Sequence, residues 1–140
     1  NNLTRVKRTF TLMHKSDTEL NRAFIIAEVG QNHQGDPENA LEYIKVFSTN
    51  GADAVKFQKR DNKTLFSADA YSQIYNGHNP FGRTYGAHRE ALELEPGFMR
   101  ELKSECRNNN VAFMATPFDE VSLDVLLDNG VDILKIASFD

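Results

Sequence analysis

The chain repeats one pattern, in which short apolar runs alternate with longer amphipathic segments. Four runs of four or five residues are almost entirely apolar, at residues 24–27, 54–57, 111–114 and 133–137. Continuous apolar runs of this length are typical of strands that are buried on both faces of a parallel sheet. The segments between them place apolar residues three and four positions apart, which predicts helices. Strands that alternate with helices indicate a parallel α/β fold.

Turn and cap residues mark the ends of the predicted helices. Asp36 is followed by Pro37, an order typical of the cap and first position of a helix, and Asp119 is placed to cap the last one. Asn-Gly pairs at 50–51 and 129–130 predict two helix ends and lead into strands in the same way. This weak internal repeat favours a barrel of β/α units. A doubly wound sheet is the alternative.

Two segments fall outside the repeat. Residues 59–95 are polar, rich in aromatic residues and interrupted by glycine and proline, which predicts a long loop. A loop of this length inside a compact domain is usually functional or disordered. Residues 1–23 show only weak alternation and are interpreted as an N-terminal arm or hairpin. We therefore expect the β/α domain to occupy residues 24–140.

Composition excludes several classes of partner. The chain has 16 basic and 20 acidic residues and a net charge of −4, which argues against nucleic acid as a partner. No apolar run approaches the roughly 20 residues of a membrane span, so no membrane partner is expected. The single cysteine, Cys106, cannot form an internal disulfide, which predicts a reducing compartment, the cytoplasm.

Polar residues follow the predicted strands at their carboxyl ends, where α/β folds carry their chemistry. In chain order they are Glu28, Lys56, Gln58, Thr116, Lys135, Ser138 and Asp140. A lysine inside an apolar strand is costly unless an anion neutralises it. Lys56 and Lys135 therefore have two interpretations. One is an inward ion pair with Glu28 that holds the core, and the other is a pocket for a substrate with several negative charges.

Five segments in order, residues 24–35, 51–58, 85–94, 116–119 and 134–138, resemble the sialic acid synthases. This family includes N-acetylneuraminate, legionaminate and pseudaminate synthases and their 9-phosphate relatives. The resemblance implies a (β/α)8 TIM-barrel type of fold, followed by a small antifreeze-like C-terminal domain. Such a barrel typically needs about 250 residues. The 140 residues would supply about the first four β/α units, and the absence of an initial Met predicts a longer reading frame.

The resemblance also implies an activity and its partners. Members condense phosphoenolpyruvate with an N-acylated aminohexose, N-acetylmannosamine or a derivative, and form a nine-carbon 2-keto acid and phosphate. A divalent metal, Mn or Mg, is expected, with ligands outside this chain. The full-length protein is expected to be a homodimer, and the 140-residue chain alone to self-associate or be inactive. The alternatives are a related phosphoenolpyruvate-dependent keto-sugar-acid synthase and a noncatalytic half-barrel that binds sugar or phosphate.

Three residues are implied as catalytic by the same resemblance. Lys56 and Lys135 match the family lysines that hold phosphoenolpyruvate. Glu28 matches a glutamate near the reacting centre, where it would act as an acid or a base.

Three further residues are implied as substrate contacts. Ser138 matches a hydroxyl donor in the anion site, Gln58 matches a sugar contact, and Asp140 aligns with a position that is often glutamate and contacts the sugar. Thr116 is interpreted as a residue that fixes loop geometry, and His33 as a hydrogen-bonding loop residue rather than a metal ligand.

Overall fold

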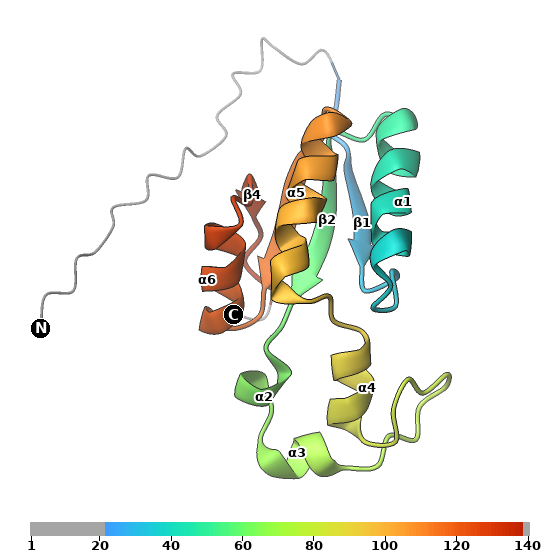
Figure 1. The fold of residues 1–140 in the computed structure, drawn as a ribbon, viewed down its shortest axis with the longest axis vertical. Coiled ribbons are helices and arrows are strands. Elements are labelled where there is room, and N and C mark those ends of the chain that lie inside the picture. The colour runs from blue at the N-terminus through green and yellow to red at the C-terminus, as the bar shows by residue number, and fades with distance from the viewer. Residues whose placement is uncertain (1–21, 139–140) are drawn as a thin grey trace, which may run out of the picture.

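The structure, a computed structural model, describes residues 22–138. It contains one four-stranded sheet, in which all strands are parallel and follow one another in chain order (Figure 1). The strands are β1 (Ile26–Gly30), β2 (Ala54–Lys59), β3 (Ala112–Pro117) and β4 (Ile133–Leu134). Almost all of the predicted N-terminal arm, and Asp140, lie outside the described residues.

Three helices connect the strands: α1 (Pro37–Thr49), α5 (Met99–Asn108) and α6 (Glu120–Asp128). A short 3-10 helix, η1 (Pro96–Phe98), precedes α5. Right-handed crossovers between strands in sequential order place the helices on one face of the sheet. A doubly wound sheet would reverse its strand order and carry helices on both faces. The prediction of four β/α units of a TIM-barrel type of fold is confirmed, and the doubly wound alternative is excluded.

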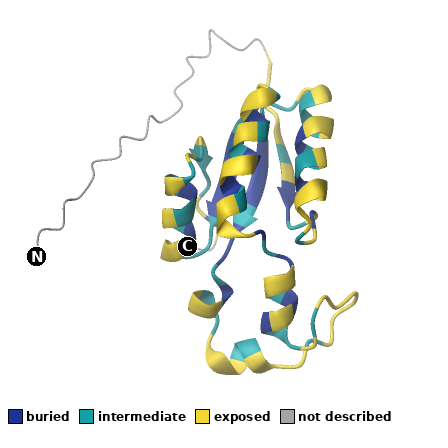
Figure 2. Cartoon of the chain, viewed as in Figure 1, coloured by how far each residue is buried: buried dark blue, intermediate teal, exposed yellow. Residues whose placement is uncertain are grey.

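The hydrophobic core lies between the sheet and these helices. Val55 and Phe57 of β2 and Phe113 of β3 are 0–1% exposed, and β2 and β3 form the dark centre of Figure 2. The rings of Phe57 and Phe113 lie 6.0 Å apart, and Ile44 and Leu102 cover them from the helices. None of the helices within residues 22–138 has the length and apolarity needed to cross a membrane.

The predicted helix caps are confirmed. The Asp36 carboxylate accepts hydrogen bonds from the backbone N–H groups of Glu38 at 2.8 Å and Asn39 at 3.2 Å. Asp119 accepts one from the N–H of Ser122 at 2.7 Å. Each bond satisfies a donor that the first turn of a helix leaves without a partner. Local sequence therefore positions both helices.

Residues 59–95 were predicted as loop, and this prediction was wrong in part. Lys59 belongs to β2, and the remaining residues, 60–95, are here named the excursion. They form three short helices, α2 (Asn62–Leu65), α3 (Ala68–Ser72) and α4 (Tyr85–Ala91), beyond the carboxyl end of β2 (Figure 1). Each helix is capped by a side chain that accepts a hydrogen bond from a backbone N–H of its first turn. The capping residues are Asp61, Ser67 and Thr84. Helices of four to seven residues are too short to show an apolar periodicity.

All four predicted strands also have other bounds in the structure, and β2 extends beyond Phe57 to Lys59. β1 includes Glu28 and Gly30, and β3 includes Thr116 and Pro117, all of which were predicted as loop. β4 has two residues instead of five. Pairing with a neighbour extends β1 and β3, because Glu28 is in register with Lys56 and β3 pairs along all six residues of β2. β4 pairs with β3 alone among the described strands.

Candidate active site

The register of the sheet brings the predicted site residues together. Glu28 of β1 stands opposite Lys56 of β2, and Gln58 stands opposite Thr116 of β3. Side chains of paired residues project from the same face, and Lys56 and Gln58, two positions apart, share that face. The N–H of Lys135 donates to a carbonyl of β3 at 3.0 Å, which places this residue beside the same row.

A cavity of about 270 Å³ lies at these strand ends. Eight residues line it: Glu28, Lys56, Gln58, Thr116, Phe118, Lys135, Ala137 and Ser138. Every predicted site residue within the described part of the chain is among them. Asp140 lies outside the described residues, so its place in the site stays a prediction.

The two lysines of the cavity differ in their partners. Lys56 is buried and forms an ion pair with the half-exposed carboxylate of Glu28. Lys135 makes no ion pair with any residue in the range 22–138, and its Nζ donates to the carbonyl of Ile136 at 3.3 Å. The ion pair considered from the sequence therefore forms, but it lies in the cavity wall. Lys135 leaves the cavity with a positive charge that an anionic ligand would neutralise.

Thr116 is a site residue that sequence reasoning missed. It was interpreted as fixing loop geometry, but it lies in β3, is 2% exposed and lines the cavity. Its Oγ1 is buried without a hydrogen-bond partner among the described residues. An unsatisfied buried hydroxyl costs about 1–3 kcal/mol, which a ligand in the cavity would recover. The signal was available in the sequence, because a polar residue directly follows an apolar strand.

Gly30 leaves room for two of the site side chains. Its φ is +59°, and a Cβ added there would lie 3.2 Å from Oε1 of Glu28 and 3.5 Å from Nε2 of Gln58. Glycine adopts this left-handed conformation without a steric penalty. The Glu28 carboxylate and the Gln58 amide therefore both lie close to Gly30 at the end of β1.

Two other reactive side chains do not belong to the site. His33 is 2% exposed, and its Nδ1 accepts a hydrogen bond from the N–H of Gly35 at 3.0 Å. Burial lowers the pKa of His33 to about 4, so the ring is neutral, and its interpretation as a loop residue is confirmed. Cys106 is buried in the core, and burial raises the pKa of its thiol to about 12. Neither group lines the cavity that contains Lys56 and Lys135.

The expected metal has no complete ligand set in the described part of the chain. Residues 22–138 contain no cluster of three or more His, Cys, Asp or Glu side chains that would hold a metal ion. We therefore assign no chemical step to a metal.

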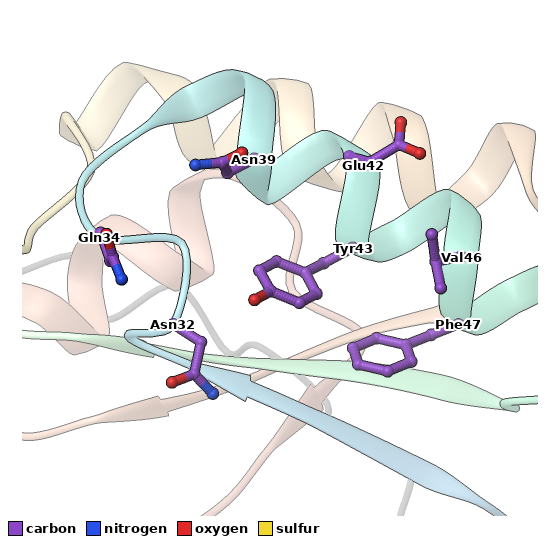
Figure 3. Close-up of a pocket in the computed structure, with 7 residues that line it drawn as sticks. All are labelled: Asn32, Gln34, Asn39, Glu42, Tyr43, Val46 and Phe47. Carbon is purple, nitrogen blue, oxygen red and sulfur yellow. The ribbon is translucent and has the colours of Figure 1, made fainter.

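A second cavity, of about 300 Å³, lies between α1 and the loop that precedes it (Figure 3). Its lining residues are Asn32, Gln34, Asn39, Glu42, Tyr43, Val46 and Phe47. This lining has one carboxylate and no basic side chain. It does not suit an anionic substrate, unlike the cavity with Lys56 and Lys135.

Fold and site together define an α/β chain of the TIM-barrel type with a lysine-lined cavity at the carboxyl ends of its strands. The model of the NeuB family matches residues 43–140. The chain therefore belongs to the NeuB family, the family of sialic acid synthases and related enzymes, as the resemblance in the sequence predicted.

Named relatives agree with this assignment. The chain is 40% identical over 117 residues to N-acetylneuraminate-9-phosphate synthase of Drosophila melanogaster. This match covers 84% of this chain and 32% of that protein. It is 40% identical over 116 residues to N,N'-diacetyllegionaminic acid synthase of Legionella pneumophila, covering 82% and 33%. The chain spans about a third of the length of the curated relatives it matches.

A solved structure supports the fold. The N-acetylneuraminic acid (sialic acid) synthetase of Leptospira borgpetersenii serovar Hardjo-bovis, in complex with citrate, superposes with a TM-score of 0.67 at 36% identity. The match covers 86% of this chain and 38% of that one.

Proposed function

We propose that the full-length protein containing this chain condenses phosphoenolpyruvate with an N-acylated aminohexose, N-acetylmannosamine or a derivative. The products are a nine-carbon 2-keto acid and phosphate. One observation carries the proposal: Lys56 and Lys135 line one cavity together with the hydroxyl groups of Thr116 and Ser138. Phosphoenolpyruvate presents a carboxylate and a phosphate, and ammonium and hydroxyl donors match both groups.

The ion pair between Lys56 and Glu28 links substrate binding to the state of the Glu28 carboxylate. An anion that binds Lys56 competes with Glu28 for the same ammonium group. Binding of phosphoenolpyruvate would therefore release the Glu28 carboxylate beside the reacting atoms. A released carboxylate can accept or return a proton, which suits the proposed role of Glu28 as acid or base.

The proposed reaction forms one carbon–carbon bond and breaks one carbon–oxygen bond. C3 of the enol attacks the aldehyde carbon of the open-chain sugar, and the aldehyde oxygen takes up a proton. Water adds at C2 and loses a proton. The C2–O bond to phosphate then breaks as the keto group forms, and the departing phosphate takes up the proton of the C2 hydroxyl. Fixed lysines hold the enol for attack, and Glu28 exchanges the protons. Gln58 and Asp140 are proposed to contact the sugar.

The test replaces each lysine by alanine in the full-length protein. We expect Lys56→Ala and Lys135→Ala to abolish phosphate release from phosphoenolpyruvate in the presence of N-acetylmannosamine, because each removes a fixed charge from the anion site. Lys45→Ala, on the exposed face of α1, serves as the matched control and should leave turnover intact. Unchanged turnover in both site variants would contradict the proposal.

The acceptor is identified by a second assay on the unaltered protein. N-acetylmannosamine, its 6-phosphate and arabinose 5-phosphate are each incubated with phosphoenolpyruvate, and the product is weighed by mass spectrometry. A nine-carbon product supports the proposal, and an eight-carbon product from arabinose 5-phosphate would identify a related keto-sugar-acid synthase. Binding of ligand by calorimetry without phosphate release would identify a noncatalytic protein.

A further inference from the structure

Arg60 lies next to the candidate active site, where β2 ends and the excursion begins. The residue is 8% exposed and is not among those that line the cavity. Its NH2 group donates a hydrogen bond to Oε1 of Gln58 at 2.7 Å. Its guanidinium carbon lies 3.7 Å from the centre of the Phe118 ring. Arg60 therefore contacts two residues that line the cavity, Gln58 and Phe118, without lining it itself.

The contact with Arg60 decides which end of the Gln58 amide faces the site. A guanidinium group has only hydrogen-bond donors, so the amide atom that it meets must be the carbonyl oxygen. The Nε2 group of Gln58 then points the other way. It lies 3.5 Å from the position that a Cβ on Gly30 would take, and Oε1 of Glu28 lies 3.2 Å from the same position. The Nε2 donor of Gln58, a residue that lines the cavity, thus lies on the same side of the amide as the Glu28 carboxylate.

Arg60 is itself held by a buried carboxylate from the excursion. Oε2 of Glu93 accepts a hydrogen bond from the backbone N–H of Arg60 at 3.2 Å, and Oε1 lies 3.8 Å from its NH1. Lys59 and Gln31 bond the same carboxylate at 3.1 Å and 2.9 Å. The NH1 group is buried and makes no hydrogen bond among the described residues, so the bond to Gln58 and the Phe118 ring hold the guanidinium in place. The orientation of Gln58 therefore depends on Arg60.

We propose that Arg60 is a positioning residue for the sugar acceptor and acts through Gln58. It fixes the amide so that Nε2 donates a hydrogen bond to an oxygen of the N-acyl aminohexose, a hydroxyl or the acyl carbonyl. This inference rests on the proposed function. In this proposal the lysines hold phosphoenolpyruvate, and the amide of Gln58 holds the sugar. Loss of Arg60 therefore weakens sugar binding and leaves phosphoenolpyruvate binding intact.

The test is a double-mutant cycle in the full-length protein, with KM measured for each substrate. We expect Arg60→Met to raise the KM of the sugar about tenfold, the effect of one hydrogen bond, with little change in the KM of phosphoenolpyruvate. In a Gln58→Ala background, Arg60→Met should have no further effect on the sugar KM, because Arg60 then has no amide to orient. Arg22→Met is the matched control. Arg22 pairs with Asp53 at the amino end of β2, and its replacement should change neither KM.

Three results would overturn the inference: an unchanged sugar KM in Arg60→Met, an equal rise in both KM values, or additive effects in the double mutant. If the unaltered protein forms no product, the proposed function fails and the sugar contact of Gln58 fails with it. An active protein with an unchanged sugar KM in Arg60→Met overturns only the role of Arg60.

A crystal structure of the unaltered full-length protein with N-acetylmannosamine decides the matter if Arg60→Met does not fold. We expect the Arg60–Gln58 hydrogen bond to persist while the other end of the amide contacts a sugar oxygen. An arginine turned away from Gln58, or a Gln58 amide beyond hydrogen-bond distance of the sugar, would overturn the inference.

Discussion

Three lysines near the strand ends differ in what neutralises them. Lys59 is buried against the buried carboxylate of Glu93 and also donates to two backbone carbonyls. Lys56 pairs with the half-exposed Glu28, and Lys135 has no carboxylate partner within residues 22–138. A buried ion pair such as Lys59–Glu93, in which both groups have several hydrogen-bond partners, is structural, because neither charge is free for a ligand. A lysine with an exposed or missing partner is available to a substrate.

The neutral state of His33 predicts a pH dependence of stability. Its pKa is about 4 in the folded protein, against an ordinary value of 6.5. Between these values the unfolded chain binds a proton that the folded chain does not, so stability decreases as the pH falls from 6.5 towards 4. The shift corresponds to about 3 kcal/mol in the free energy of unfolding. Denaturant unfolding of the full-length protein at pH 7.5, 6 and 5 measures the part of this loss that falls above pH 5, about 2 kcal/mol.

The control for this prediction is His33→Asn, which retains an acceptor for the Gly35 N–H but has no titratable group. The variant should lose less stability than the unaltered protein over the same pH range. Equal losses in the two proteins would contradict the assignment of the effect to His33.

The elements of the chain are joined at the carboxyl ends of the strands, where the excursion packs on the β1–α1 loop. Gln31 of this loop bonds Glu93, and Gly35 lies against α4 so closely that a Cβ on it would lie 2.1 Å from the carbonyl oxygen of Ala91. The φ of Gly35 is +76°. The loop and the excursion are therefore in contact near the end of β2, where Arg60 lies.

A comparison of Gly35 with Gly51 distinguishes two effects of an added Cβ on the free energy of unfolding: backbone strain and the close contact with α4. Gly35 and Gly51 both have positive φ, but a Cβ on Gly51 meets nothing within 4 Å. We expect Gly51→Ala to cost about 1 kcal/mol in the free energy of unfolding, from backbone strain alone. Gly35→Ala should cost about 1–3 kcal/mol more, because the loop must separate from α4. Denaturant unfolding of the two full-length variants gives the comparison, and equal losses would contradict the contact.

The whole described molecule has helices on one face of an open sheet. β1 and β4 are its edge strands among residues 22–138. Large apolar residues near these edges are exposed, with Ile26 at 44% and Ile136 at 79% (Figure 2 shows exposure along the chain). Open edges and exposed apolar side chains favour association with another chain, whereas a closed barrel has no edges.

The 140-residue chain, expressed by itself, is therefore predicted to self-associate and to lack activity. Light scattering should show dimers or larger species, because each copy exposes unpaired strand edges and apolar residues such as Ile25. The full-length protein, measured in the same buffer, is the control and should show one defined species. A monodisperse, active monomer of the 140-residue chain would contradict this prediction.

The amino-acid sequence alone determined the parallel α/β fold, the order of the four strands and of the three helices that connect them, and five residues of the cavity. These features depend on local patterns. An apolar run indicates a buried strand, and a cap such as Asp36 or Asp119 acts within three residues of its own helix. Lys56 and Gln58 are two positions apart in one strand, so their side chains share a face of the sheet whatever the neighbouring strands are. The position of Asp140 stays a prediction, because it lies outside the described residues.

Only the tertiary structure decided the lengths of β3 and β4, the place of Thr116 in the cavity and the link from Glu93 through Arg60 to Gln58. Each depends on a partner that is distant in the sequence. Strand length is set by the neighbouring strand, and Glu93 bonds the backbone of a residue 33 positions away. Gln58 likewise accepts a hydrogen bond from Arg60, whose backbone N–H donates to that distant carboxylate. Pairing across such separations follows from the packing of the whole chain, which no local pattern contains.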